Sequence, residues 1–166
     1  MSDVHPRDRS VAWAFVAAQV GLLVSLVGSP DGNLWPNSHA TRVLASTLVI
    51  AGFVVIIVGA WGIRRGLSAL PIPTASAELQ TTGLYRWCRH PIYAGVLLLC
   101  AGVTIGHAHP VAVALLGTVA FFFVAKATFE ERYLRLRFAD YNVYAGRTPM
   151  LIPGLRPGKR PVKPGP

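Results

Sequence analysis

The sequence has 166 residues, of which 52% are hydrophobic and 14% are charged, with a mean hydropathy of +0.46 and a formal net charge of +9. This length allows one domain, and the apolar content argues against an ordinary soluble fold of this size. The basic residues flank apolar segments and do not alternate with aromatic residues on a polar surface. This pattern argues against nucleic-acid binding and indicates a membrane protein.

The first apolar segment is Val11–Val27, whose polar side chains are Gln19 and Ser25. It is just long enough to cross a hydrocarbon core of about 30 Å. A signal peptide is the competing interpretation, but the run is too long and Gly28–Asp31 lacks a small-x-small cleavage pattern. The following stretch, 29–42, is rich in turn-forming residues and is predicted to be a loop.

The second apolar segment, Val43–Ile63, has no charged residue and is predicted to be the clearest spanning helix. Arg64 and Arg65 follow it as interfacial anchors. The spacing Gly62-x-x-x-Gly66 would allow another helix to approach closely. Residues 67–82 are too polar to span and are predicted to form a loop on the membrane surface.

A third apolar segment, Ile92–Ile105, follows Pro91, which suits the first turn of a helix. The segment is short, so a spanning helix would have to begin near or before His90. A very short connection at 106–109 then requires residues 111–129 to return antiparallel as a fourth helix.

This hairpin brings together two charged groups that are distant in the sequence. If the chain reverses at Ala108, His90 lies level with Lys126, and Arg86 lies level with Glu130. The fourth helix is expected to continue past the bilayer through residues 130–138, where Glu131 and Arg135 have i,i+4 spacing.

The remaining segments define the domain organisation and the orientation. Residues 1–66 are predicted to hold the first two spans, residues 67–153 a core with an ordered carboxyl-terminal segment, and residues 154–166 a disordered basic tail that touches anionic lipid. With four spans, every basic residue except Arg42 falls on one side. The positive-inside rule places both termini and the charged cluster in the cytoplasm. The expected fold is an all-α polytopic membrane protein with about four transmembrane helices.

The cytoplasmic cluster holds residues that suit a zwitterionic small molecule with hydroxyl groups: Tyr85, Arg86, Arg89, His90, Tyr93, Lys126, Glu130 and Glu131. The alternative is a non-enzymatic membrane protein in which these side chains only anchor the helices at the interface.

The order of motifs resembles a known family. Thr82-Gly83-Leu84-Tyr85-Arg86-x-x-Arg89-His90-Pro91-Ile92-Tyr93-Ala94-Gly95 is followed by a short hairpin, Glu130-Glu131-x-x-Leu134-x-x-x-Phe138, Tyr141-x-x-Tyr144 and Pro153. This pattern, over about residues 70–154, is similar to the isoprenylcysteine carboxyl methyltransferase and phospholipid methyltransferase group of integral-membrane enzymes.

The resemblance implies S-adenosylmethionine as methyl donor, bound on the cytoplasmic side. It implies cofactor contacts at Glu78, Leu79, Gln80, Tyr85, His90, Tyr93 and Glu130, with Tyr141 and Tyr144 covering the adenine. Lys126 occupies a position associated with the substrate. We expect Arg89 and His90 to face the donor's carboxylate, Glu130 to bind its ammonium or ribose hydroxyls, and Glu131 to be available as a base.

An alternative enzyme class and the choice of acceptor remain open. A membrane reductase of the sterol or steroid reductase type would use NADPH, with Arg86 and Arg89 near the 2′-phosphate. The acceptor is expected to be lipophilic, and carboxylate, thiol and amine acceptors all fit. His39, His107 and His109 on the outer side have no acid or cysteine partner, so no metal site is predicted.

Overall fold

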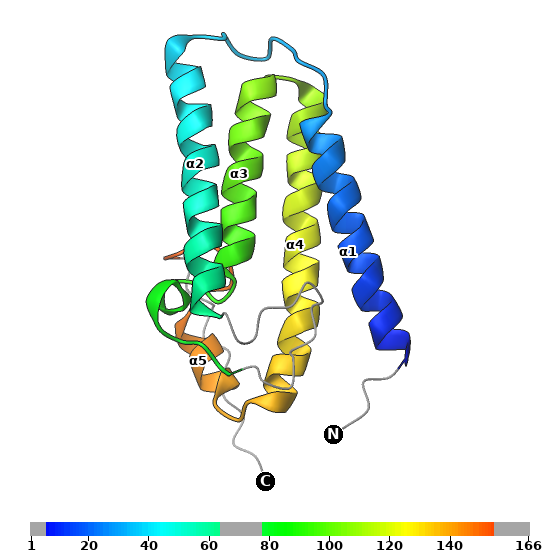
Figure 1. The fold of residues 1–166 in the computed structure, drawn as a ribbon, viewed down its shortest axis with the longest axis vertical. Helices are drawn as coiled ribbons and strands as arrows, with labels where there is room; N and C mark the ends of the chain where they lie inside the picture. The colour runs from blue at the N-terminus through cyan, green and yellow to red at the C-terminus, as the bar shows by residue number, and fades with distance from the viewer. Residues whose placement is uncertain (1–5, 64–77, 155–166) are drawn as a thin grey trace.

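The computed structural model describes residues 6–63 and 78–154. Within these ranges the chain forms five α-helices, one short 3-10 helix and no strand: α1 (Pro6–Val27), α2 (His39–Gly62), η1 (Gly83–Arg86), α3 (Pro91–His107), α4 (Pro110–Arg137) and α5 (Tyr141–Arg147). Helices α1 to α4 lie lengthwise, and η1 and α5 lie at one end of them (Figure 1). The all-α prediction is therefore confirmed.

Three helices of the described ranges are long and apolar enough to cross a membrane, and they are α1, α2 and α4. Helix α3 is also apolar but has 17 residues. It begins at Pro91 and not before His90, because the fixed φ of proline and its missing N–H suit the first helical position.

Helices α1 and α2 both begin earlier than the apolar segments predicted. Helix α2 starts at His39 because Ser38 and Thr41 form a capping box before it. The Ser38 hydroxyl accepts from the Thr41 backbone N–H at 3.2 Å, and the Ser38 N–H donates to the Thr41 hydroxyl at 2.9 Å. The predicted loop is therefore shorter than its turn-rich composition indicated.

Two residues, Ala108 and His109, connect α3 to α4, which run in opposite directions (Figure 1). The backbone of Ala108 is left-handed, with φ of 48°, and ends α3. The His109 side chain caps α4 by accepting from the Val111 backbone N–H at 3.1 Å. Helix α4 continues to Arg137, which confirms the predicted extension beyond its apolar part.

The closest helix contact joins α2 to α3 and depends on glycine. A Cβ atom at Gly52 would lie 2.6 Å from the Gly95 carbonyl oxygen, and one at Gly95 would lie 2.9 Å from the Gly52 oxygen. Gly102 makes a similar approach to the Ala45 carbonyl oxygen, at 2.6 Å. Small residues let helix backbones meet in this way in membranes. The predicted Gly62-x-x-x-Gly66 approach is not tested, because Gly66 lies outside the described residues.

At the end of the bundle opposite η1 and α5, the loop between α1 and α2 folds over the carboxyl terminus of α3. The Gly32 and Leu34 backbone N–H groups donate to the carbonyls of His107 and Ala108 at 2.7 and 2.8 Å. The Trp35 indole donates to the Ile105 carbonyl at 2.8 Å. These bonds satisfy carbonyls that a helix end otherwise leaves unpaired.

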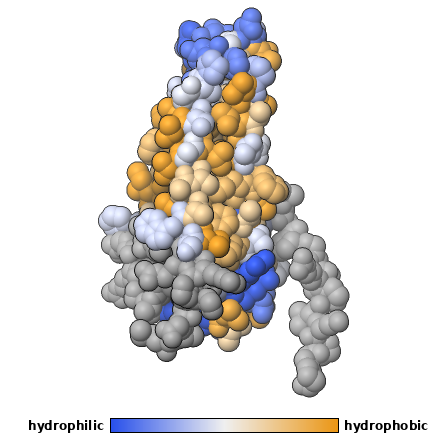
Figure 2. Space-filling model, turned by 90° about the vertical axis from the view of Figure 1, so that its right-hand side faces the viewer, coloured by the Kyte–Doolittle hydropathy of each residue, from blue (hydrophilic) through white to orange (hydrophobic). Residues whose placement is uncertain are grey.

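The buried core lies where α1, α3 and α4 meet, at Leu26, Cys100, Ala112, Val119 and Phe123. Large apolar side chains elsewhere on the helices face outward, among them Phe53, Trp61 and Phe121. Figure 2 shows a broad apolar band between more hydrophilic ends. This surface suits a lipid bilayer around the helices.

Several predictions concern residues outside the described ranges. They are the anchors Arg64 and Arg65, the glycine Gly66, the surface loop from 67 to 77, and the basic tail from 155 onward. These stay predictions.

Candidate functional site

The turn before α3 is paired with the segment after α5. The Arg89 backbone N–H donates to the Pro149 carbonyl at 2.9 Å, and the His90 N–H donates to the Met150 carbonyl at 3.0 Å. Pro91 then begins α3, so Arg89 and His90 are fixed directly before the first turn of this helix. The carboxyl-terminal segment therefore closes over the start of α3.

Glu131 of α4 is the centre of a buried ion-pair network. Its carboxylate accepts from Arg89 Nε at 2.7 Å and from Arg135 at 3.0 Å, and it lies 3.4 Å from His90 Nε2. Only 3% of Glu131 is exposed. The Arg89 guanidinium also donates to the carbonyls of Ala145 and Thr148 at 2.8 and 2.5 Å. Arg89 thus joins α3, α4 and the end of α5.

Glu130 faces the first turn of α3. The Tyr93 hydroxyl donates to its Oε2 atom at 2.9 Å, and the His90 Nδ1 atom lies 3.7 Å from the same oxygen. The rings of His90 and Tyr93 are stacked, with centroids 5.3 Å apart and planes at 2°. The Glu130 side chain is 26% exposed, which makes it the more accessible of the two acids.

Lys126 lies one helical turn before Glu130, deeper among the apolar residues. Only 4% of it is exposed. Its ammonium donates to the side-chain oxygen of Gln19 in α1 and lies 5.3 Å from the centre of the Tyr93 ring. Lys126 and Glu130 have i,i+4 spacing, yet their side chains bind other partners.

The meeting of His90 with Glu130 and Glu131 refines the predicted register of α3 and α4. The prediction placed His90 level with Lys126, one turn earlier in α4. Side chains of a helix tilt toward its amino terminus, so the carboxylates of residues 130 and 131 cover the turn before them. Arg86, predicted level with Glu130, is instead exposed, with its guanidinium 5.4 Å from the Trp87 ring centre.

Three of the expected cofactor contacts lie beside the end of α2. The Gln80 amide donates to the Gly62 carbonyl at 3.1 Å, and the Tyr85 hydroxyl donates to the Gly59 carbonyl at 3.3 Å. The Tyr144 hydroxyl donates to the Tyr85 carbonyl at 2.6 Å. Burial raises the pKa of Tyr144 to about 12.

Tyr141 is 1% exposed and lies edge-on to Tyr144, with ring centroids 6.0 Å apart. Its hydroxyl is buried without a hydrogen-bond partner among the described residues. Burial, and then the charge of the nearby Glu131 carboxylate, raise the pKa of this hydroxyl. A buried hydroxyl without a partner is rare and calls for an explanation.

The predicted site residues therefore divide into two groups. The cluster around Glu130 and Glu131 collects the larger group: Arg89, His90, Tyr93, Lys126, Glu130, Glu131 and Tyr141, with Tyr85, Gln80 and Tyr144 on its α2 side. Glu78 is exposed and Leu79 is half-buried, directly after the undescribed residues. The pair of Glu131 and Arg135, predicted from its i,i+4 spacing, is confirmed. Sequence reasoning missed Gln19 as a Lys126 partner. The signal for Gln19 was its place as a lone amide in an apolar segment.

Comparison with known proteins adds an independent observation. The profile of the phospholipid methyltransferase family matches residues 40–141, which is more than half of the chain. The chain belongs to the phospholipid methyltransferase family. The match begins at α2 and ends at α5, so it includes Arg89, His90, Glu130 and Glu131 and leaves out α1.

Two curated proteins are also similar to this family member. Protein-S-isoprenylcysteine O-methyltransferase B of Arabidopsis thaliana is 36% identical over 78 residues, which are 46% of this chain and 40% of the plant protein. The nickel-cobalt-cadmium resistance protein NccN of Alcaligenes xylosoxydans xylosoxydans is 33% identical over 81 residues, 48% of this chain and 38% of that protein. The matches thus span about two fifths of each relative's length.

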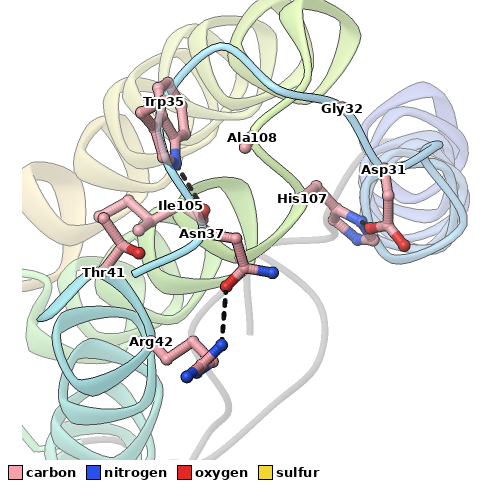
Figure 3. Close-up of a pocket in the computed structure, with 10 residues that line it drawn as sticks. Asp31, Gly32, Trp35, Asn37, Thr41, Arg42, Ile105, His107 and Ala108 are labelled. Carbon is pink, nitrogen blue, oxygen red and sulfur yellow. Dashed lines mark hydrogen bonds and ion pairs between the residues drawn. The ribbon is translucent and has the colours of Figure 1, made fainter. Parts of the chain in front are cut away.

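A separate pocket of about 160 Å³ lies at the opposite end, between the loop over α3 and the start of α2 (Figure 3). His107 Nδ1 lies 2.8 Å from an Asp31 oxygen there, and Arg42 donates to the Asn37 side chain at 3.3 Å. The described part of the chain contains no group of three or more His, Cys, Asp or Glu side chains placed to bind a metal.

Proposed function

We propose that this chain is an integral-membrane methyltransferase that uses S-adenosylmethionine and acts on a lipophilic acceptor. The observation that carries the proposal is the cluster of His90, Tyr93, Glu130 and Glu131, which lies inside the residues that match the family. The Arabidopsis relative, an O-methyltransferase by name, supports the same reaction class.

The residues of the cluster fit this donor. An amino-acid ammonium and ribose hydroxyls donate hydrogen bonds, and they need a carboxylate oxygen that does not already accept one. The Oε2 atom of Glu130 accepts from Tyr93, while its Oε1 atom has no hydrogen-bond partner among the described residues. The unpaired hydroxyl of Tyr141 offers a further polar contact near the same acids.

When bound, S-adenosylmethionine would supply a sulfonium methyl group. A lone pair of the acceptor would form the new bond to this methyl carbon, and the electron pair of the broken S–C bond would stay on sulfur. Such an in-line displacement needs alignment more than acid or base chemistry. Alignment can contribute about 7–11 kcal/mol of the barrier reduction. The protein's main tasks are therefore to position the reactants and to exclude water.

We assign these tasks to different members of the cluster. Glu130 binds the donor, and Lys126 orients the polar head of the acceptor. The Arg89 guanidinium is occupied by Glu131 and two backbone carbonyls, so we assign Arg89 a positioning role and not a contact with the donor's carboxylate. An ionised carboxylate acceptor needs no base. A protonated thiol or amine would also have to pass its proton to a base. Glu131, expected in this role, is buried and already binds both arginines, so we assign it to positioning Arg89 and not to proton transfer.

The proposed topology adds α3 as a fourth span. Its 17 residues extend about 25 Å, and the paired turn of Arg89 and His90 continues it into the interface. With this topology all basic residues except Arg42 lie on one side. We therefore propose that the cluster faces the cytoplasm of the cell inner membrane, where S-adenosylmethionine is available.

Calorimetry on the purified full-length chain in detergent tests the proposal. We expect S-adenosylhomocysteine to bind the unaltered protein, and Glu130→Ala to abolish that binding. Asp140→Ala is the matched control, because Asp140 is an exposed acid near the end of α4 whose side chain caps no helix. NADPH binding without S-adenosylhomocysteine binding would favour a reductase and refute the proposal.

A further inference from the structure

The contact between Gln19 and Lys126 joins α1 to the candidate site across a long sequence separation. Lys126 donates to the Gln19 side-chain oxygen, and its ammonium also lies over the face of Tyr93. The described chain provides no hydrogen-bond partner for the amide nitrogen of Gln19. Helix α1 lies outside the residues that match the family, so the family match assigns no role to Gln19.

The residue type at position 19 has a physical consequence. A leucine would leave the buried ammonium of Lys126 without its oxygen partner, and a glutamate would neutralise its charge. Glutamine satisfies one donor of the ammonium and leaves the positive charge in place. Holding a charge this deep is costly, and such residues in membrane segments mark substrate pathways.

The charges of the cluster favour an anion beside this lysine. Three cations, Arg89, Lys126 and Arg135, face two carboxylates, Glu130 and Glu131, while Glu131 holds both arginines. These side chains, counted without His90, carry one positive charge more than the two acids compensate. Among the described residues, Lys126 is the cation of this set that forms no ion pair with an acid, because the neutral Gln19 amide is its partner.

Aromatic side chains lie on both sides of Lys126 along α4, where they contact α1. Phe15 of α1 packs against Phe122 and Phe129 of α4, with ring centroids 5.7 and 5.3 Å away. Gln19 itself is half-buried, whereas Lys126 is fully buried. The Gln19 amide is therefore more accessible than the Lys126 ammonium, and aromatic side chains lie beside both.

We propose that Gln19 and Lys126 together bind an oxyanion on the head group of an amphiphilic acceptor, and that Gln19 determines this specificity. In the structure, the Gln19 oxygen occupies the position beside Lys126 that we assign to the acceptor's oxyanion. When the acceptor binds, its oxyanion replaces the Gln19 oxygen as the hydrogen-bond acceptor of the Lys126 ammonium. The Gln19 amide then rotates so that its N–H groups donate to the same oxyanion. This inference rests on the proposed function, because it names the chemistry of the acceptor.

Binding of matched probes to the full-length chain in detergent tests the inference. The first pair is S-farnesylcysteine, which has a free carboxylate, and its carboxamide; the second is lysophosphatidylethanolamine and a monoacylglycerol. We expect the member of one pair that carries the oxyanion to bind on the order of tenfold more tightly, since hydrogen bonds to a charged group have this magnitude. The pair that shows the preference tells whether the oxyanion is a carboxylate or a phosphate.

Variants at position 19 give the decisive comparison. Gln19→Leu should bring the affinities for the two members of that pair to within about twofold of each other. Gln19→Glu keeps a partner for Lys126 and serves if Gln19→Leu does not fold. It should reduce the affinity for the oxyanion further. Ser25→Ala, which removes the other polar side chain of the α1 apolar segment, should leave the preference unchanged.

Donor binding separates the two proposals. S-adenosylhomocysteine should bind Gln19→Leu and the unaltered chain with equal affinity. If S-adenosylhomocysteine binds but neither probe pair shows a preference for the oxyanion, the inference is wrong and the proposed function stands. The same conclusion follows if Gln19→Leu keeps the preference. If the unaltered chain does not bind S-adenosylhomocysteine, the proposed function fails and the inference fails with it.

Discussion

Arg89 Nε donates to the Glu131 carboxylate at 2.7 Å, and both side chains are less than a tenth exposed. These two residues join the start of α3, the cytoplasmic part of α4 in our proposal, and the segment after α5. The relationship explains how a site can form from parts of the chain that are far apart in the sequence.

We expect Arg89→Met to destabilise the protein by about 3–5 kcal/mol, because it leaves the buried Glu131 carboxylate without its shortest contact. Thermal unfolding in detergent would measure this. The double variant Arg89→Met/Glu131→Leu removes both charges and should recover part of the loss. A single variant as stable as the unaltered protein would show that the pair does not hold the segments together.

The glycine contact between α2 and α3 predicts position-dependent effects of alanine. Gly95→Ala should lower stability by about 1–3 kcal/mol, because the new methyl group would meet the Gly52 carbonyl and helix α2 would have to move. Gly117→Ala is the control, since a Cβ atom at Gly117 meets nothing within 4 Å. Equal melting temperatures for the two variants would contradict the close approach of these helices.

Tyr93→Phe tests the hydrogen bond to Glu130 without removing the ring that stacks on His90. We expect donor affinity to fall about tenfold, because the Glu130 carboxylate loses the hydroxyl that orients it. Calorimetry with S-adenosylhomocysteine measures the change. Tyr93→Leu, which also removes the ring, should lose more affinity, and an unaltered affinity in both variants would exclude this role for Tyr93.

The proposed orientation is open to a labelling experiment. Asn33 and Asn142 are both exposed, one in the loop over α3 and the other in α5. Cys88 and Cys100 are buried, so their background reaction should be low. In intact cells, an impermeant maleimide should label Asn33→Cys and not Asn142→Cys. The opposite pattern would place the candidate site outside the cytoplasm.

The sequence predicted the helices well because apolar length and helix breakers are local signals. The extension of α4 beyond the apolar residues followed from its alternating charged residues, and the structure confirms it to Arg137. The start of α2 was missed because a capping box adds a turn of polar residues before the apolar segment. Local chemistry of this kind is visible in the sequence once Ser38 and Thr41 are considered together.

Pairings between helices were less predictable, since they depend on direction and depth. The hairpin argument placed His90 near the acids of α4 but one turn away from Glu130 and Glu131, because it counted backbone levels and not side-chain tilt. The tight α2 and α3 contact was missed, although Gly52 and Gly59 have the same spacing as Gly95 and Gly102. No local pattern indicates that Gln19 meets Lys126.

Transfer of tritium from S-adenosyl-[methyl-³H]methionine tests the central claim most directly. Membranes that contain the full-length chain would be incubated with this donor, extracted into organic solvent and counted, with Glu130→Ala and Asp140→Ala membranes in parallel. We predict label in the lipophilic extract for the unaltered chain and for Asp140→Ala, and none above background for Glu130→Ala. Equal labelling of the extract with and without the chain would contradict the account.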